Sequence, residues 1–341
     1  MGRFILRRFG SGILVLFVVV TVTFILARVV PSDPAMKWVG IHATEEQKVA
    51  ARKELGLDKP LWDQYLKYMS DLLHGNFGVS IATHRPVVDE LKIAIPNTME
   101  LVMTSVVIAL VLGLIVGVYS ASNENTVFDH AGRFFSVAII SMPGFWVALM
   151  LQILFSSKLH LLPLTGQFDT VVQLMAPVHR VTGLPMLDCL VTGNWTALGN
   201  LIWHSVLPLS ALVSYNLGLT SRMTRSILLE VLNEDYIRAS RAYGIKERIV
   251  VWRYAMKNVM GTVVTVLALS AGYALVNTFI TESVFSWPGV GSYIASAVIN
   301  VDYPAIIGVT MFASVAYVVL NLVADIIVAL DPRVRLTEGE T

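Results

Sequence analysis

Apolar residues in this chain gather into six long runs separated by more polar segments. A helix needs about 20 mostly apolar residues to cross the hydrocarbon core of a bilayer. Six stretches reach about that length: 9–30, 101–121, 134–155, 201–219, 263–280 and 306–330. The first is too long for the apolar core of a signal peptide, and no small-residue cleavage site follows it. The pattern therefore predicts an all-α membrane protein with about six transmembrane helices, the first of which is retained.

The composition supports a membrane protein over a soluble one. The 341 residues are 55% hydrophobic and only 14% charged, whereas soluble domains carry about 25% charged residues. A formal net charge of +1 makes a nucleic acid an unfavourable partner. The single cysteine, Cys189, excludes an internal disulfide and a multi-cysteine metal site. We expect a thiol without a role there, and no bound metal.

Basic residues fall mainly on one side of the expected spans. Arg3, Arg7 and Arg8 precede the first run, and the segment 220–258 holds eight Lys and Arg residues, whereas 281–305 holds none. Cytoplasmic loops carry an excess of Lys and Arg, so we expect both termini in the cytoplasm. The first span then lies within 1–30, and an extracytoplasmic loop follows at 31–98. The core of five helices covers 99–330 and includes the cytoplasmic loop 220–258. The tail is 331–341.

The extracytoplasmic loop contains two expected helices. Thr44 and Gln47 form a capping box for the first, and Gly56 ends it. The second, over 61–73, is amphipathic, with Tyr65 and Tyr68 at helical spacing. Two interpretations are open: a small lid packed on the membrane core, or a docking surface for an external partner.

A short helix is expected in the cytoplasmic loop, where residues 233–244 read NEDYIRASRAYG. Asn233, Glu234 and Asp235 supply an N-cap and negative charge for the helix dipole, and Gly244 fits the position just past the C-terminus. A helix of two to three turns is marginal in water when isolated. Another part of the protein, or a partner, must hold it.

The faces of this short helix differ in chemistry. Tyr236, Ala239, Ser240 and Tyr243 share one face, and Arg238 and Arg241 lie on a neighbouring one. Small residues between aromatic ones suit a helix seated in a groove of another protein. Tyrosines at headgroup depth and arginines on lipid phosphate suit an interfacial helix equally well. Spacing alone leaves both interpretations open.

Polar residues within or beside the spans are further candidates for function. Asn321 and Asp325 lie one turn apart in the sixth run. We expect Asp325 to pair with Arg222 or Arg225, and a substrate or proton role is the alternative. Met142-Pro143-Gly144 should loosen the third span.

A tight turn is expected after the fifth span, at Trp287-Pro288-Gly289, with Glu282 just before it. This turn is a candidate outer gate or contact for an external binding protein. A tryptophan anchor at the membrane interface explains Trp287 almost as well.

Several blocks of sequence resemble the permeases of ABC importers, and most closely their dipeptide/oligopeptide/nickel branch. The cytoplasmic helix resembles the EAA region of these permeases, and further blocks follow in the family's order at 55–60, 75–80, 253–258, 285–291, 302–304 and 331–333. The segment 181–188, with His204 after it, is similar to dipeptide permeases in particular. Arg238 at the position of the motif's glutamate, Asn76 for a frequent aspartate and Thr262 for a frequent proline depart from the family pattern.

The resemblance implies a type I importer fold in the bacterial inner membrane, forming half of a translocation pathway. It implies a second homologous permease, two cytoplasmic ATPases and an extracytoplasmic solute-binding protein as partners. The chain itself would be non-catalytic and without a cofactor, and it has no G-x-x-x-x-G-K-[ST] loop to cradle a nucleotide. Dipeptides are the favoured cargo; nickel chelates, glutathione and oligosaccharides are the alternatives. Tyr236, Ala239, Ser240 and Gly244 would seat on the ATPase, with Arg238 and Arg241 at the rim of its groove.

Two other classes of protein fit the sequence less well. A secondary carrier working alone would need paired charges at the membrane midplane and an internal repeat, and Asp325 is the one acidic candidate near the bilayer. An intramembrane enzyme would need a constellation such as HExxH, which the sequence lacks.

Overall fold

The computed structural model describes residues 2–29, 34–40, 43–54 and 56–330, and over these it is built from helices joined by turns, without a named strand. The tail at 331–341 lies outside the described residues. Four helices are long and apolar enough to cross a membrane, or six if each of two bent pairs is one span. The upper number agrees with the six predicted runs, which fall in α1 (Gly2–Val29), α5 (Val87–Ser122), α6–η1 (Val127–Lys158), α10 (Trp195–Leu232), α13 (Met256–Phe285) and α15 (Tyr303–Leu330).

The third predicted span is sharply bent. It divides into α6 (Val127–Ser141), α7 (Gly144–Leu151) and the π-helical η1 (Gln152–Lys158), with 107° between its two halves. Met142 is extended at φ −89° and ψ 135°, as expected for a residue that precedes a proline. Pro143 then occupies the N-cap of α7. The loosening expected at this proline is therefore a change of direction.

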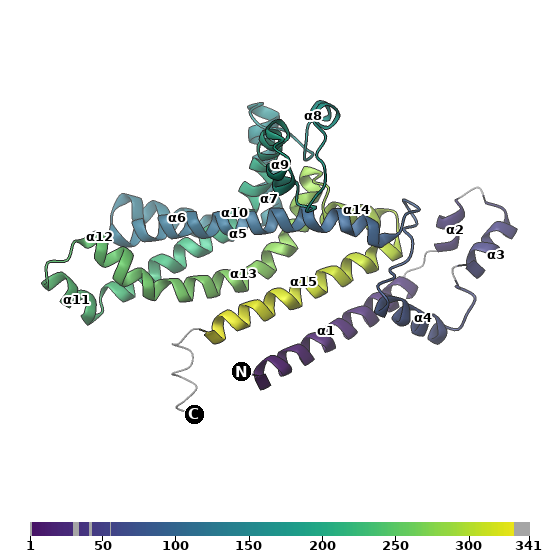
Figure 1. The fold of residues 1–341 in the computed structure, drawn as a ribbon, viewed down its shortest axis with the longest axis horizontal. Helices are drawn as coiled ribbons and strands as arrows, with labels where there is room; N and C mark the ends of the chain where they lie inside the picture. Colours follow the sequence, from purple (N-terminus) through teal and green to yellow (C-terminus); the bar gives the residue numbers. More distant parts are fainter. Residues whose placement is uncertain (1, 30–33, 41–42, 55, 331–341) are drawn as a thin grey trace.

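The centre of the bundle is the close pair α5 and α10 (Figure 1). A Cβ atom on Gly113 would lie 2.6 Å from Cβ of Thr220, and one on Gly117 would lie 2.6 Å from Cβ of Thr224. Small residues of this kind let two membrane helices approach closely. The helices α6 and α13 pack against α10, and α15 packs against α13.

The first span lies at the edge of the bundle, where α1 packs along α15 (Figure 1). It carries α4 (Leu61–Leu73): the ring of Phe24 lies 5.2 Å from that of Tyr65 and 5.3 Å from that of Tyr68. The capping box predicted for α3 (Glu45–Glu54) is confirmed, since the Thr44 N–H donates to Gln47 Oε1 at 2.9 Å. This packing agrees with the lid interpretation, although the lid rests on the first span rather than on the central pair. The remaining helix of this region is α2 (Pro34–Val39).

The two ends of the molecule carry different elements (Figure 1). The short helices α11 (Asp235–Ala242) and α12 (Glu247–Ile249) lie at the end that also holds the start of α1. The helices α2, α3 and α4 lie at the opposite end, and α14 (Val290–Ile299) lies towards it. The helices α7, α8 (Thr170–Met175) and α9 (Pro185–Val191) project from one side of the bundle.

Candidate coupling site

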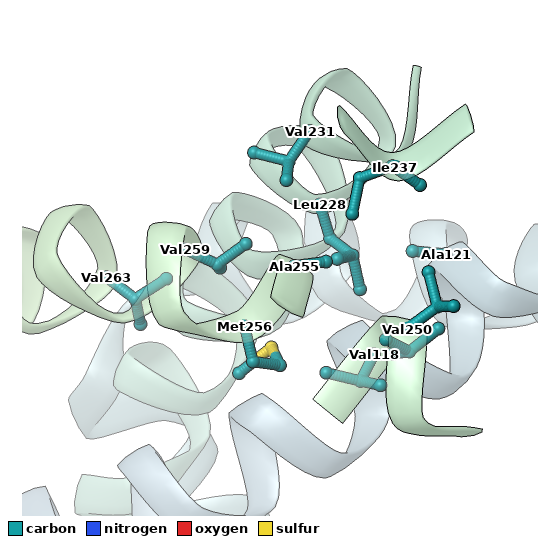
Figure 2. Close-up of a cluster of buried hydrophobic side chains, with 11 residues drawn as sticks. Val118, Ala121, Leu228, Val231, Ile237, Val250, Ala255, Met256, Val259 and Val263 are labelled. Carbon is teal, nitrogen blue, oxygen red and sulfur yellow. The ribbon is translucent and has the colours of Figure 1, made fainter. Parts of the chain in front are cut away.

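The predicted cytoplasmic helix exists as α11, and its own chain holds it in place. Ile237 is fully buried in an apolar cluster with Leu228 of α10, Val250 of η2 (Val250–Ala255) and Ala255 (Figure 2). Burying an isoleucine side chain of this kind contributes about 1.5–3 kcal/mol. Tertiary packing therefore supplies the stability that an eight-residue helix lacks by itself.

The C-terminus of α11 is closed by a Schellman motif. Gly244 has φ +76°, its N–H donates to the Arg241 carbonyl at 2.9 Å, and the Ile245 N–H donates to the Ser240 carbonyl at 3.3 Å. The prediction that Gly244 ends this helix is confirmed. At the other end Glu234 occupies the N-cap position without a side-chain cap hydrogen bond, so the acidic residues contribute charge near the helix dipole and not a cap.

Two side chains of α11 connect it to the segment that follows. The Arg241 guanidinium donates to both carboxylate oxygens of Glu247, at 3.1 and 2.7 Å. This contact raises the pKa of Arg241. The Tyr236 hydroxyl accepts a hydrogen bond from the Asn258 side chain at the start of α13. The helix is thus fixed to α10, α12 and α13 at once.

The outward face of α11 is made of the remaining predicted residues. Tyr236 is 39% exposed and Tyr243 86% exposed, and the other exposed members of the predicted set are Glu234, Asp235, Arg238, Ala239, Arg241 and Gly244. Ser240 is buried, and its hydroxyl donates to the Tyr236 carbonyl. Its predicted place on the docking face is wrong, because it lies one turn from Ile237 on the side that packs inward. Arg241 is paired with Glu247, and Arg238 makes a longer contact within the helix, Nη1 to Asp235 Oδ1 at 3.3 Å.

The turn after α13 differs from its prediction. Trp287 is 1% exposed, and Glu282 is fully buried. The tryptophan-anchor interpretation is wrong, since an interfacial anchor must reach the headgroups. Because both side chains are buried, neither can contact a binding protein directly. Of the predicted residues in this turn, Pro288 alone is exposed.

Glu282 instead ties α5, the turn and α14 together. Its carboxylate accepts from the Thr98 hydroxyl and from the Gly291 N–H, both at 2.6 Å. The Asn97 side chain donates to the Pro288 carbonyl at 2.7 Å. A Cβ on Gly289 would lie 2.2 Å from Glu282 Oε1, so only glycine fits beside the carboxylate. The site is a buried polar junction between sequence segments about 190 residues apart.

Asp325 pairs with a residue that the sequence did not single out for it. Its carboxylate lies 3.0 Å from the Arg8 guanidinium on α1. The predicted partner Arg225 is engaged elsewhere, and Arg222 forms no ion pair with Asp325 in the described chain. The prediction failed because it assumed that the sixth span faces α10, whereas α15 has α1 beside it. Asn321 lines the same α1–α15 cleft as Arg8 and Asp325.

A buried ion pair between α6 and α10 escaped the sequence analysis. Arg225 donates to both oxygens of Asp129, at 2.5 and 2.7 Å, and the Asp129 side chain is fully buried. The signal was present in Thr126-Val127-Phe128-Asp129, a helix-start pattern in which Thr126 accepts from the Asp129 N–H.

The apolar spans define the class of this chain, an integral membrane protein of the helical type, and comparison with known proteins gives the family. The family described as "Binding-protein-dependent transport system inner membrane component" matches residues 113–336. Residues 1–102 match the N-terminal family of the same transport-system membrane components. The chain belongs to this family of inner-membrane permeases. Members are non-catalytic membrane subunits of ABC transporters in the bacterial inner membrane, and they work with partner subunits.

Curated relatives cover nearly the whole chain. The probable D,D-dipeptide transport system permease protein DdpB of Escherichia coli is 40% identical over 335 residues, 98% of each chain. The di/tripeptide transport system permease protein DppB of Pseudomonas aeruginosa is 37% identical, over 98% of this chain and 99% of the relative. The glutathione transport system permease protein GsiC of Escherichia coli is 31% identical, over 98% and 99%.

Proposed function

We propose that this chain forms half of the translocation pathway of an importer for short peptides, with a second homologous permease as the other half. The support for peptides is the named cargo of the relatives at 34–40% identity, which are dipeptide and di/tripeptide permeases. The glutathione permease, itself serving a short peptide, is more distant at 31%. Nickel chelates and oligosaccharides have no relative among these to favour them.

The single observation that carries the mechanism is the two-sided construction of α11. Ile237 and Ser240 pack into the chain, and Asp235, Arg238, Ala239 and Tyr243 face outward. A helix already ordered in the free subunit avoids much of the entropy cost of docking. We assign this outward face to a cytoplasmic ATPase, with Ala239 as the point of close approach and Arg238 at the rim.

The anchoring of α11 gives the ATPase a rigid connection to the spans. Moving a two-state equilibrium from 1:99 to 99:1 takes about 5.5 kcal/mol of differential binding. ATP binding and hydrolysis occur on the partner subunits in this proposal, and this chain needs no cofactor. A displacement of α11 reaches α10 through the Ile237 cluster and α13 through Tyr236 and Asn258. An external solute-binding protein delivers the peptide at the opposite end.

Site-directed labelling of cysteine tests the docking face, because the one native thiol is buried. Cys189 is shielded from solvent, so a cysteine introduced by Ala239→Cys is the accessible thiol. A maleimide reagent should label it in the free chain and fail to label it in the complete transporter. Glu124→Cys, exposed between α5 and α6, is the matched control and should react in both. Equal labelling of Ala239→Cys with and without the ATPases would remove α11 from the interface.

Uptake in cells lacking their own peptide permeases tests the cargo separately. Cells supplied with the complete transporter should use a dipeptide as the source of a required amino acid, in competition with unlabelled di- and tripeptides. Growth on a nickel- or oligosaccharide-dependent medium, with no dipeptide uptake, would show that the cargo is not a peptide. The proposed role as a permease would still stand.

A further inference from the structure

A basic cavity lies between α5, α6 and α10, away from α11. Its volume is about 220 Å³, and its polar lining comes from three arginines and four serines, Arg133, Arg222, Arg225, Ser120, Ser136, Ser221 and Ser226. None of these residues contributes to the coupling face or to the buried junction at Glu282. The cavity therefore needs an explanation of its own.

Positive charge at the cavity exceeds what the chain neutralises. Asp129 is saturated by Arg225, the Ser120 hydroxyl and the Asn125 N–H. Arg133 lies 3.7 Å from the same carboxylate. Within the part of the chain that the structure describes, Arg222 forms no hydrogen bond or ion pair. Arg225 and Arg133 thus share Asp129, Glu124 acts on Arg225 without a direct contact, and Arg222 has no carboxylate partner in the described chain, so an anion would complete the site.

Hydroxyl groups add donors without partners. Ser136 and Ser221 are buried, Ser226 is exposed, and none of the three side chains forms a hydrogen bond among the described residues. Guanidinium and hydroxyl donors together match the several acceptor oxygens of a phosphate group. These hydroxyl groups line the cavity, where a bound phosphate could accept from them.

The surroundings of the cavity favour a lipid as the source of that phosphate. The cavity lies near the end of α5 and the start of α6, on the side that the Lys and Arg pattern predicts to face the cytoplasm. Val137 lines it, and Phe134 beside it on α6 is 69% exposed. An apolar face next to a basic pocket suits acyl chains below a headgroup, and basic pockets between spans on this side bind anionic lipids.

We propose that the phosphate of an anionic phospholipid from the cytoplasmic leaflet binds in this cavity. Arg222 and Arg133 contact the phosphate, Ser226 donates to it, and the acyl chains lie along Phe134 and Val137. The bound lipid joins α6 to α10 beside the Asp129–Arg225 pair. Inorganic phosphate shares the headgroup chemistry but gains nothing from the apolar face, which allows the two sources to be separated.

Native mass spectrometry of the full-length chain in neutral detergent tests the proposal. The chain is titrated with phosphatidylglycerol or with phosphatidylcholine of the same acyl chains. The unmodified chain should retain the anionic lipid in preference. Arg222→Gln should lower that preference about fivefold, the factor expected for about 1 kcal/mol per basic residue. Arg248→Gln removes an equal charge from the exposed α12 and should leave the preference within about twofold.

A second variant keeps all three arginines. Ser226→Asp places a carboxylate one turn from Arg222 and should lower the preference for phosphatidylglycerol as Arg222→Gln does. Equal retention of both lipids by the unmodified chain, or equal loss in Arg222→Gln and Arg248→Gln, overturns the proposal. Thermal stabilisation by inorganic phosphate as large as that by phosphatidylglycerol overturns the lipid as the source.

Discussion

The packing of α11 and the junctions around Glu282 and Asp302, which lie towards the opposite end, rest on different chemistry. Around α11, the side chains of Leu228, Ile237, Val250 and Ala255 are fully buried in an apolar cluster (Figure 2). Towards the other end, buried carboxylates organise the chain. Glu282 accepts from the Gly291 N–H, and Asp302 accepts from the Ser80 hydroxyl and the Ala82 N–H.

The difference bears on how each end tolerates movement. Apolar contacts are non-directional and survive small displacements, which suits a segment that transmits motion. Hydrogen bonds to a buried carboxylate require defined distances and angles, and one unpaired partner is costly. We therefore expect substitutions near Glu282 and Asp302 to destabilise the fold, and substitutions on the exposed face of α11 to disturb coupling in a protein of unchanged stability.

The largest expected effect is at Gly291. A Cβ there would lie 2.3 Å from the backbone Cα of Phe279, and a backbone atom cannot move aside as a flexible side chain can. Gly291→Ala should lower the free energy of unfolding by about 3 kcal/mol, measured as folded yield and thermal unfolding in detergent. Gly244→Ala is the control at the other end, where no atom lies within 4 Å and only φ +76° opposes a side chain. It should cost about 1 kcal/mol; equal losses in the two variants would contradict the contrast.

The next effect concerns Asp188, a buried carboxylate outside the spans. It accepts from the Thr182 N–H and hydroxyl and from the Gly183 N–H. Burial alone raises its pKa, but these donors outweigh burial and lower the pKa below its ordinary value. Asp188→Asn should destabilise the loop by about 2 kcal/mol at pH 7.

The pH dependence of that loss follows from the lowered pKa. Stability from Asp188 is complete above the unfolded pKa of about 3.9 and disappears as pH falls through the lower folded pKa. The gap in unfolding temperature between the unmodified chain and Asp188→Asn should therefore close in acid. A gap that stays constant from pH 7 down to strong acid would show that the carboxylate charge is not the cause.

The helix α11 could be predicted from the sequence because the residues that end it lie close to it in the chain. Gly244 ends the helix as expected, and the arginines lie on its surface, whereas the expected side-chain N-cap is absent at Glu234. What could not be foreseen was which face turns inward. Ser240 and Ala239 are both small, and only the position of α10 decides that Ser240 is the buried one.

The opposite end was misjudged because its contacts join distant segments. Trp287 and Glu282 were expected at a surface, yet Thr98 of α5 donates to Glu282, and Trp287 is buried in a cluster with Leu101 and Leu201. The same reason explains Asp325, whose partner Arg8 lies more than 300 residues away on α1. The hydrophobic pattern predicts six spans but not which spans pack against each other. Side-chain pairs between spans therefore could not be predicted from the sequence.

A bulky residue on the exposed face of α11 should uncouple transport without unfolding the protein. Ala239→Trp should reduce peptide uptake at least tenfold, about 1.4 kcal/mol of lost coupling, because Ala239 is exposed and no packing in this chain opposes the new ring. Membrane abundance and unfolding temperature should match the unmodified chain. Glu124→Trp, an equal enlargement on the same side of the membrane, should transport normally. Normal uptake by Ala239→Trp would place the ATPase contact elsewhere.

The smallest effect is expected at the ion pair that joins α11 to α12. Arg241 and Glu247 are about half exposed, and exposed pairs contribute about 0–1 kcal/mol. Arg241 nevertheless makes two hydrogen bonds to Glu247, and these join two separate helices. Lys92 makes a single contact with Asp89 within one turn of α5, so its orientation is less restricted. A double-mutant cycle of Arg241→Gln and Glu247→Gln should give a coupling energy of about 0.5 kcal/mol, and the same cycle at Lys92 and Asp89 should give about half that. A larger coupling energy at Lys92 would mean that the Arg241–Glu247 pair stabilises α11 no better than an ordinary exposed ion pair. The apolar cluster around Ile237 would then hold α11 by itself.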